Sequence, residues 1–163
     1  MWALFVTLAW SQDLSQVVSG RWLPTQERTE VERMLADAVE RSAASVSFVF
    51  RPLARPQLEP QATACPGYTM TLTGDRFRVQ CDGKSAFEWG VGQKGSWTRD
   101  DGEALTVSLQ RQGRSFVLDF AGERGGKKFT YAFPESGGLV VTQEVYSPQL
   151  GVPMVWTLSY ARR

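Results

Sequence analysis

From Tyr68 to Tyr160, apolar and polar residues alternate in short stretches that are separated by turn residues. Successive side chains of a strand point to opposite faces of a sheet, so each stretch predicts a strand with one apolar and one polar face. The apolar positions are Tyr68, Met70, Leu72, Phe77, Val79, Cys81, Leu105, Val107, Leu109, Phe116, Leu118, Phe120, Phe129, Tyr131, Phe133, Met154, Trp156, Leu158 and Tyr160. The apolar face of such a meander must be covered by closure into a barrel, by a second sheet or by a helix.

Eight groups of turn residues separate nine predicted strands in this region. They are Gly74-Asp75, Asp82-Gly83, Gly92 to Gly95, Asp101-Gly102, Gln112-Gly113, Gly122 to Gly126, Gly137-Gly138 and Pro148 to Gly151. Residues 17–23 predict one further strand before them. Because turns about 8–12 residues apart are typical of barrels and sandwiches, we expect an all-β fold, an antiparallel meander barrel of about ten strands.

One helix is predicted after the first strand, over about residues 26–50. Thr25 is a suitable N-cap, and Pro52 should end the helix because proline disrupts helical hydrogen bonding. The helical stripe consists of Val31, Leu35, Ala38, Ser42, Val46, Val49 and Leu53. Residues 45–50 also suit a strand, but the stripe favours the helix. Residues 54–66, which contain three prolines, are expected to form a linker over the surface.

The length and charge of the chain limit the kinds of protein that it can be. With 163 residues and a net charge of +1, it fits one domain without a basic patch for nucleic acid. Residues 2–10 form an apolar run typical of an export signal, although no basic residue precedes it; a strand or a misplaced start codon is the alternative. The run is too short to span a bilayer, so no stable membrane insertion is expected. We interpret residues 1–16 as a signal-like leader or mobile N-terminus of a periplasmic or secreted protein.

The two cysteines, Cys65 and Cys81, are expected to form a disulfide. If Gly74-Asp75 closes a hairpin, Tyr68 lies opposite Cys81, and the turn residues between Cys65 and Tyr68 can bring the two sulfur atoms together. Such a bridge suits an exported protein, whereas two separate buried thiols are the alternative.

The composition also excludes several kinds of chemistry. The chain has no histidine, so Ser-His-Asp and Cys-His arrangements are impossible and the commonest metal ligand is absent. The segment 122–128 resembles a phosphate-binding loop but ends in lysine instead of Ser or Thr, and we interpret it as a hairpin tip. The acidic cluster at 100–103 lacks calcium-loop spacing. Glu88 and Asp119 fall on the polar face. We therefore predict that the protein is not an enzyme and that it has neither a cofactor nor a metal site.

Two short motifs lie in the predicted first and last strands, Gly20-x-Trp22 and Tyr160-x-Arg162. Together they resemble the lipocalin signature, in which a Gly-x-Trp of the first strand is covered by an arginine of the last. By this resemblance, Trp22 closes one end of a barrel and Arg162 stacks on it as a cation–π pair.

The order of strand, helix and hairpins over residues 18–163 resembles the bacterial lipocalin-like proteins of the calycin group. The excess of arginine over lysine, with no Asn or Ile, also suits a GC-rich bacterial genome. The helix after the first strand is closer to the fatty-acid-binding proteins, which commonly end in an Arg-x-Tyr pair that holds a carboxylate. Here that order is reversed, so carboxylate capture by this pair is not expected.

The resemblance implies a monomer that binds or transports a small hydrophobic ligand, such as a lipid or an apolar metabolite, in a barrel cavity without catalysis. Inward aromatic and methionine side chains would line it: Tyr68, Met70, Trp89, Trp97, Phe116, Phe129, Tyr131, Met154, Trp156 and Tyr160. Arg51 and Arg55 would lie near the mouth and attract an anionic head group, unless they are simply solvated.

Two alternatives to this carrier stay open. One is a half-barrel wrapped around the helix, as in periplasmic carriers of lipoproteins and acyl chains. The other is a barrel filled by its own large side chains, which has no ligand and acts as an interaction module.

Overall fold

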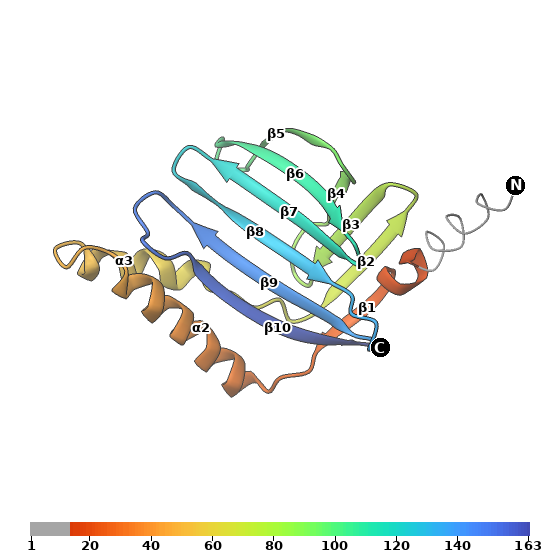
Figure 1. Ribbon diagram of the computed structural model, residues 1–163, viewed down its shortest axis with the longest axis horizontal. Coiled ribbons are helices and arrows are strands. Elements are labelled where there is room, and N and C mark those ends of the chain that lie inside the picture. The colour runs from red at the N-terminus through yellow and green to blue at the C-terminus, as the bar shows by residue number, and fades with distance from the viewer. Residues whose placement is uncertain (1–13) are drawn as a thin grey trace, which may run out of the picture.

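The computed structural model describes residues 14–163 and shows one antiparallel sheet of ten strands (Figure 1). The strands are β1 (Gly20–Pro24), β2 (Tyr68–Thr73), β3 (Arg76–Cys81), β4 (Phe87–Gly90), β5 (Lys94–Thr98), β6 (Ala104–Gln112), β7 (Ser115–Gly122), β8 (Gly125–Ala132), β9 (Leu139–Tyr146) and β10 (Met154–Arg162). The expected first strand, residues 17–23, begins later than predicted, because residues 14–18 are helical. The predicted leader falls mainly on residues 1–13, outside the described residues.

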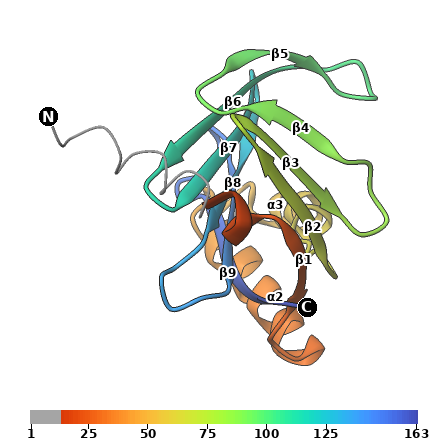
Figure 2. The ribbon, with the colours of Figure 1, turned by 90° about the vertical axis from the view of Figure 1, so that its right-hand side faces the viewer.

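The sheet is strongly curled (Figure 2), and the first and last strands of the chain, β1 and β10, are neighbours in the middle of it. The order is β4-β3-β2-β1-β10-β9-β8-β7-β6-β5, and Trp22 of β1 lies opposite Arg162 of β10. In the described part of the chain, no ladder joins β4 to β5. Side chains bridge this seam instead, with the rings of Phe87 and Trp97 5.7 Å apart in an edge-to-face arrangement. The predicted antiparallel meander of ten strands is thus confirmed, as a curled half-barrel that is open between β4 and β5.

Each of the eight predicted turns falls at a connection between consecutive strands, although the segments 92–95 and 122–126 extend into the starts of β5 and β8. The β2–β3 hairpin shows the physical reason: Gly74 has φ +60° at the first central position, a conformation that glycine adopts without a steric penalty. The resulting register places Tyr68 opposite Cys81, as predicted.

The helix after β1 is confirmed, but it is divided into α2 (Arg28–Ala44) and α3 (Arg51–Leu58), followed by a 3-10 turn, η1 (Glu59–Gln61). The predicted end near Phe50 is wrong because the chain turns after Ala44. Pro52 was expected to end a helix, yet it lies in the first turn of α3, where its missing N–H has no intrahelical partner to lose.

The two helices lie at one end of the curled sheet, and the helical segment 14–18 lies at the other (Figures 1 and 2). The α2 helix packs chiefly on β10, and α3 packs on α2. Ser42 fixes α2 to the β9–β10 turn, because its hydroxyl donates to the carbonyl of Val152 at 2.8 Å. No helix within residues 14–163 is long and apolar enough to cross a membrane.

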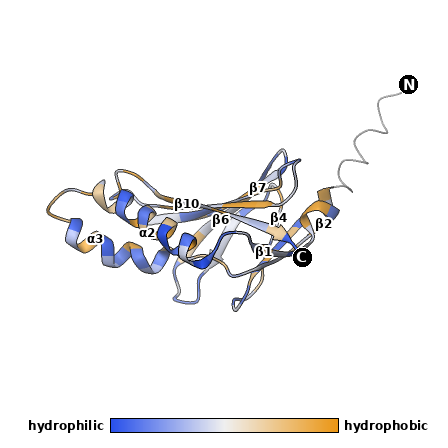
Figure 3. Cartoon of the chain, turned by 90° about the horizontal axis from the view of Figure 1, so that it is seen from below, coloured by the Kyte–Doolittle hydropathy of each residue, from blue (hydrophilic) through white to orange (hydrophobic). Residues whose placement is uncertain are grey.

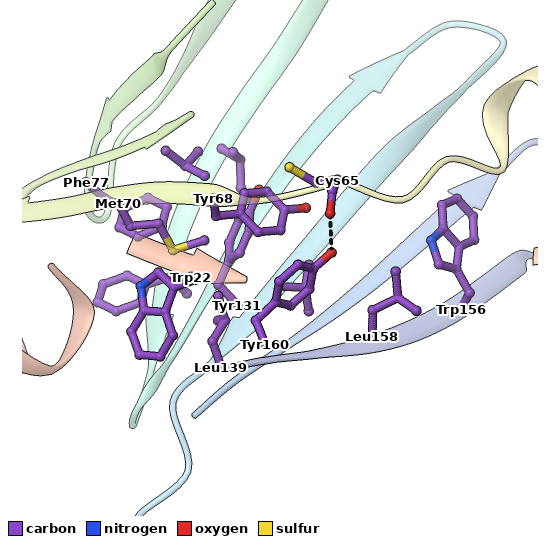
Figure 4. Packing of buried hydrophobic residues seen from close by; sticks show 14 of the residues in the cluster. Trp22, Cys65, Tyr68, Met70, Phe77, Tyr131, Leu139, Trp156, Leu158 and Tyr160 are labelled. Atoms are coloured by element: carbon purple, nitrogen blue, oxygen red, sulfur yellow. Dashed lines mark hydrogen bonds between the residues drawn. The ribbon is translucent and has the colours of Figure 1, made fainter. Parts of the chain in front are cut away.

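The end of the barrel near residues 14–18 is filled by a packed aromatic core (Figure 4). Phe77 stacks on Phe116 with ring centroids 4.9 Å apart, and Trp22 meets Phe133 edge-to-face at 5.6 Å. Toward the helices, the ring of Tyr68 lies 5.0 Å from that of Tyr160. Any space for a ligand therefore lies at the helical end, which we call the mouth.

The connection between α2 and α3 is an apolar segment at the mouth (Figure 3). Phe48, Val49 and Phe50 are exposed there, and Phe48 is 81% exposed. The predicted apolar stripe is thus split in two, because its first half lies on α2, whereas Val49 and Leu53 at its end are exposed.

Candidate ligand-binding site

Trp22 and Arg162 close the end of the barrel opposite the mouth. The indole is 2% exposed, and its Nε1 donates to the carbonyl of Val18 at 3.1 Å. The guanidinium carbon of Arg162 lies 5.0 Å from the indole centroid, so the predicted cation–π pair is present. Gly20 makes this possible, because a Cβ there would lie 3.4 Å from the Arg162 Nε and its φ is +153°. The role of this pair as a structural plug stays a prediction.

A disulfide joins Cys65 to Cys81, as predicted from their spacing, with Cα atoms 5.7 Å apart. It ties the segment before β2 to the end of β3. The bridge therefore holds residues 62–65, which we call the strap, against one side of the mouth.

The strap lies against the inner face of β9 and β10, which corrects the expectation of a linker running over the surface. The carbonyl of Thr63 accepts hydrogen bonds from Gln143 Nε2 at 3.3 Å and from Trp156 Nε1 at 3.2 Å. The Tyr160 hydroxyl donates to the carbonyl of Cys65 at 3.0 Å (Figure 4). These inward polar groups thus hold the chain across the mouth.

Two adjoining cavities remain at the mouth. The smaller, of about 150 Å³, lies between the strap, β2 to β4 and β7 to β8. The larger is an open groove of about 1050 Å³ between α3 and strands β5 to β9, and we call it the groove. Phe120, Lys127 and Phe129 line both cavities and mark their junction.

Four of the ten predicted ligand-contacting residues line these cavities. Tyr68, Phe129 and Tyr131 line the smaller one, whereas Trp97 and Phe129 line the groove. The other six, which line neither cavity, are Met70, Trp89, Phe116, Met154, Trp156 and Tyr160. Trp89 lies at the seam, where it packs on Gly95, and the remaining five belong to the filled core. Ligand contact by any of the ten stays a prediction.

The tyrosines of this region are hydrogen-bonding groups without charge. Burial raises the pKa of Tyr68 and Tyr131 far above the ordinary value, and it raises the pKa of Tyr160 to about 12. All three phenols are therefore protonated at neutral pH. They can orient a ligand only by neutral hydrogen bonds.

Arg51 and Arg55 do not provide charge to the cavities. Arg51 donates to the carbonyls of Ala44 and Val46, at 3.0 and 3.1 Å, and so caps the end of α2. Arg55 forms an ion pair with Glu40. The expectation that these arginines attract a head group finds no support in their contacts.

Lys127, which was not among the predicted site residues, lies at the junction of the two cavities. The Lys127 ammonium is 5.2 Å from the ring centroid of Phe129 and 5.4 Å from that of Trp156, and it donates to the carbonyl of Gln61 at 3.4 Å. Burial, together with the nearby charge of Lys84, lowers the pKa of Lys127 to about 8. Counting back by two from Phe129 would have placed Lys127 on the inner face.

Comparison with known proteins identifies the architecture. No family model matches the chain, and no curated protein sequence is significantly similar to it. Among solved structures, a REP1-NXSQ fatty acid transporter matches with a TM-score of 0.53 and 19% identity over 89% of this chain and 95% of its own. The chain has the fold of the fatty-acid-binding proteins.

Two further structures share the fatty-acid-binding-protein fold with this chain. A fatty-acid-binding protein from Drosophila melanogaster brain tissue has a TM-score of 0.51 and 16% identity over 89% of this chain and 98% of its own. Human cRBP IV has a TM-score of 0.52 and 15% identity over 89% and 97%. The predicted calycin resemblance is thus supported at the level of the fold, while a bacterial origin stays a prediction.

Proposed function

We propose that the chain binds a small hydrophobic molecule non-covalently in the groove. The observation that carries this proposal is the groove itself, whose volume of about 1050 Å³ is at the upper end of ordinary ligand sites, roughly 300–1,000 Å³. Its apolar lining comes from α3, the connection before it, five strands and the β9–β10 turn: Val46, Phe50, Leu53, Ala54, Leu58, Trp97, Leu105, Phe120, Phe129, Val145 and Leu150. The names of the structural neighbours, a fatty acid transporter and a fatty-acid-binding protein, support the same class of function.

The energetics favour an extended apolar ligand. Each buried methylene contributes about 0.8 kcal/mol, so a chain of about ten methylenes gains roughly 8 kcal/mol. That gain is comparable to the cost of association, about 4–15 kcal/mol. Hydrocarbon burial alone therefore gives weak binding, and a tight complex requires a polar anchor as well.

The groove can be blocked at Ala54, a half-buried residue of α3 that lines it. We expect Ala54→Trp to weaken binding of the neutral dye Nile red by about tenfold or more, because the indole would occupy the space of the ligand. Ala36→Trp, at an exposed position of α2, is the matched control and should leave dye binding unchanged. The measurement is dye fluorescence in a titration with each variant.

The natural ligand can be sought directly by extracting the protein, purified from its own host, with organic solvent and analysing the extract by mass spectrometry. A stoichiometric lipid or apolar metabolite supports the carrier function. An empty extract, together with no change in Nile red fluorescence, would contradict it.

Such a negative result would favour the second candidate, an interaction module without a ligand. The observation in its favour is the exposed apolar segment between α2 and α3, where Phe48 and Val49 are 81% and 73% exposed.

We further propose that the protein is exported, because a disulfide such as Cys65–Cys81 persists in oxidising compartments. Protein taken from its host and denatured without reductant should then show no reactive thiol. Two reactive thiols per chain would contradict export through an oxidising compartment.

A further inference from the structure

Lys127 is the unusual member of the inner face of β8. Phe120 and Val145 are its cross-strand neighbours, and Phe129 follows it on the same face. The next residue, Lys128, faces outward and pairs with Glu144 at 3.4 Å. Lys127, in contrast, forms no ion pair with any residue in the described range. Lys127 is half-buried. A half-buried ammonium without a counter-ion loses part of its hydration, and such groups often occur at functional sites.

The smaller cavity provides a second amine. Lys84, in the β3–β4 turn, lines the cavity together with Lys127, and Ser85 and Gln143 add polar groups beside them. Among the described residues that line this cavity there is no aspartate or glutamate. Its charge is therefore entirely positive, and an anion entering it would meet two ammonium groups and no repelling carboxylate.

We propose that Lys84 and Lys127 bind the anionic head group of an amphiphile whose hydrocarbon chain lies in the groove. This inference rests on the proposed function, because it assigns the head group of the same ligand. The head group is a carboxylate or a phosphate, which share the negative oxygens that two ammonium groups recognise.

The arrangement of the two cavities fixes the orientation of this ligand. Phe120, Lys127 and Phe129 line both, so a head group at Lys127 is directly continuous with the apolar groove. The core at the opposite end is filled by stacked rings such as Phe77 and Phe116, which leaves the hydrocarbon chain no path in that direction. The chain therefore runs from the junction along α3.

Binding of the anion should depend on pH. Two cavities share Lys127, and their other titratable or charged groups are Tyr68, Lys84 and Tyr131 in the smaller one and Arg99, Glu103, Arg124 and Tyr146 in the groove. Glu103 is paired with Arg99 at 2.9 Å. Because the pKa of Lys127 is about 8, raising the pH through that value removes its charge. The preference for an anionic ligand should therefore decline between about pH 7 and about pH 10.

The test compares dodecanoate, dodecyl phosphate and dodecanol, which share one hydrocarbon chain, as competitors that displace Nile red. The proteins are the wild type, Lys127→Met, Lys84→Met and the control Lys128→Met. We expect the wild type to prefer at least one anionic competitor over the alcohol by about tenfold or more. Lys127→Met should abolish this preference, Lys84→Met should reduce it, Lys128→Met should keep it, and Lys127→Arg should restore it.

The outcomes separate the two proposals. A preference for dodecanoate or for dodecyl phosphate that depends on Lys127 supports the inference and identifies the head group. Equal binding of the acid, the phosphate and the alcohol, or a preference that survives Lys127→Met, would overturn the inference and leave the proposed function standing. If none of the three displaces the dye and the dye itself does not bind, the proposed function fails and the inference fails with it. Circular dichroism shows that each variant is folded.

Discussion

Replacing Trp22 by alanine should lower the free energy of unfolding by about 3–5 kcal/mol, the usual cost of removing a large buried ring. The indole is 2% exposed, lies edge-to-face with Phe133, and carries the guanidinium of Arg162 on its other surface. Its removal would leave a void between β1, β10 and the helical segment 14–18. Denaturant unfolding followed by circular dichroism measures the change.

Two further variants serve as comparisons. Arg162→Met keeps an apolar stem near the indole but removes the cation–π contact and the hydrogen bonds from the guanidinium to the carbonyls of Gln16, Val17 and Ser19. It should therefore lower the free energy of unfolding by at least the range of the cation–π contact alone, about 0.5–2 kcal/mol. Phe48→Ala removes a ring that is 81% exposed and should change stability by less than about 0.5 kcal/mol. A loss below about 1 kcal/mol for Trp22→Ala would show that this end of the barrel is not closed by the indole.

Removal of the disulfide should have the next largest effect. It should lower the free energy of unfolding by about 3 kcal/mol, the value expected for a closed loop of this size. The bridge spans a sequence separation of 16, and its absence raises the conformational entropy of the unfolded chain. The variant is Cys65→Ala combined with Cys81→Ala, and the measurement is its free energy of unfolding beside that of the oxidised wild type.

Reductant gives the internal control for this second experiment. It should destabilise the wild type by a similar amount and leave the double variant unchanged, because the latter has no bridge to lose. Equal stability of the oxidised and reduced wild type would contradict the expected contribution of the bridge.

Local chemistry predicted the sheet well. Turns such as Gly74-Asp75 depend on residues within the turn, and the inward or outward face of a side chain follows from alternation along a strand. The register that places Tyr68 opposite Cys81 follows from those two facts, and the disulfide follows from the register. The plug was predicted from a resemblance, which supplied the contact between Trp22 and Arg162 that spacing alone does not give.

Two features that depend on distant residues, and for which no resemblance was available, were not predicted. The strap is held by side chains from β9 and β10, among them Gln143 and Trp156, which are 80 and 93 residues away from Thr63. No pattern within residues 54–66 reports those partners. The break between α2 and α3 was not predicted either, because the apolar stripe of the helix continues along the sequence into the exposed segment around Phe48. Lys127, however, was within reach of the alternation rule and was missed because its glycine-rich surroundings indicated a hairpin tip.

The pairing of β1 with β10 has a consequence for how the molecule forms. Trp22 and its cross-strand partner Arg162 are separated by 140 positions in the sequence, so the pair can form only after Arg162 has been synthesised. The hairpins from β2 to β9 can assemble locally, yet the wall between β2 and β10 stays open until the end of the chain arrives. Contacts of such large sequence separation slow folding. Closure is therefore expected to be a late step, and until then the plug, the strap and the surfaces of both cavities are accessible to chaperones or to a ligand already present.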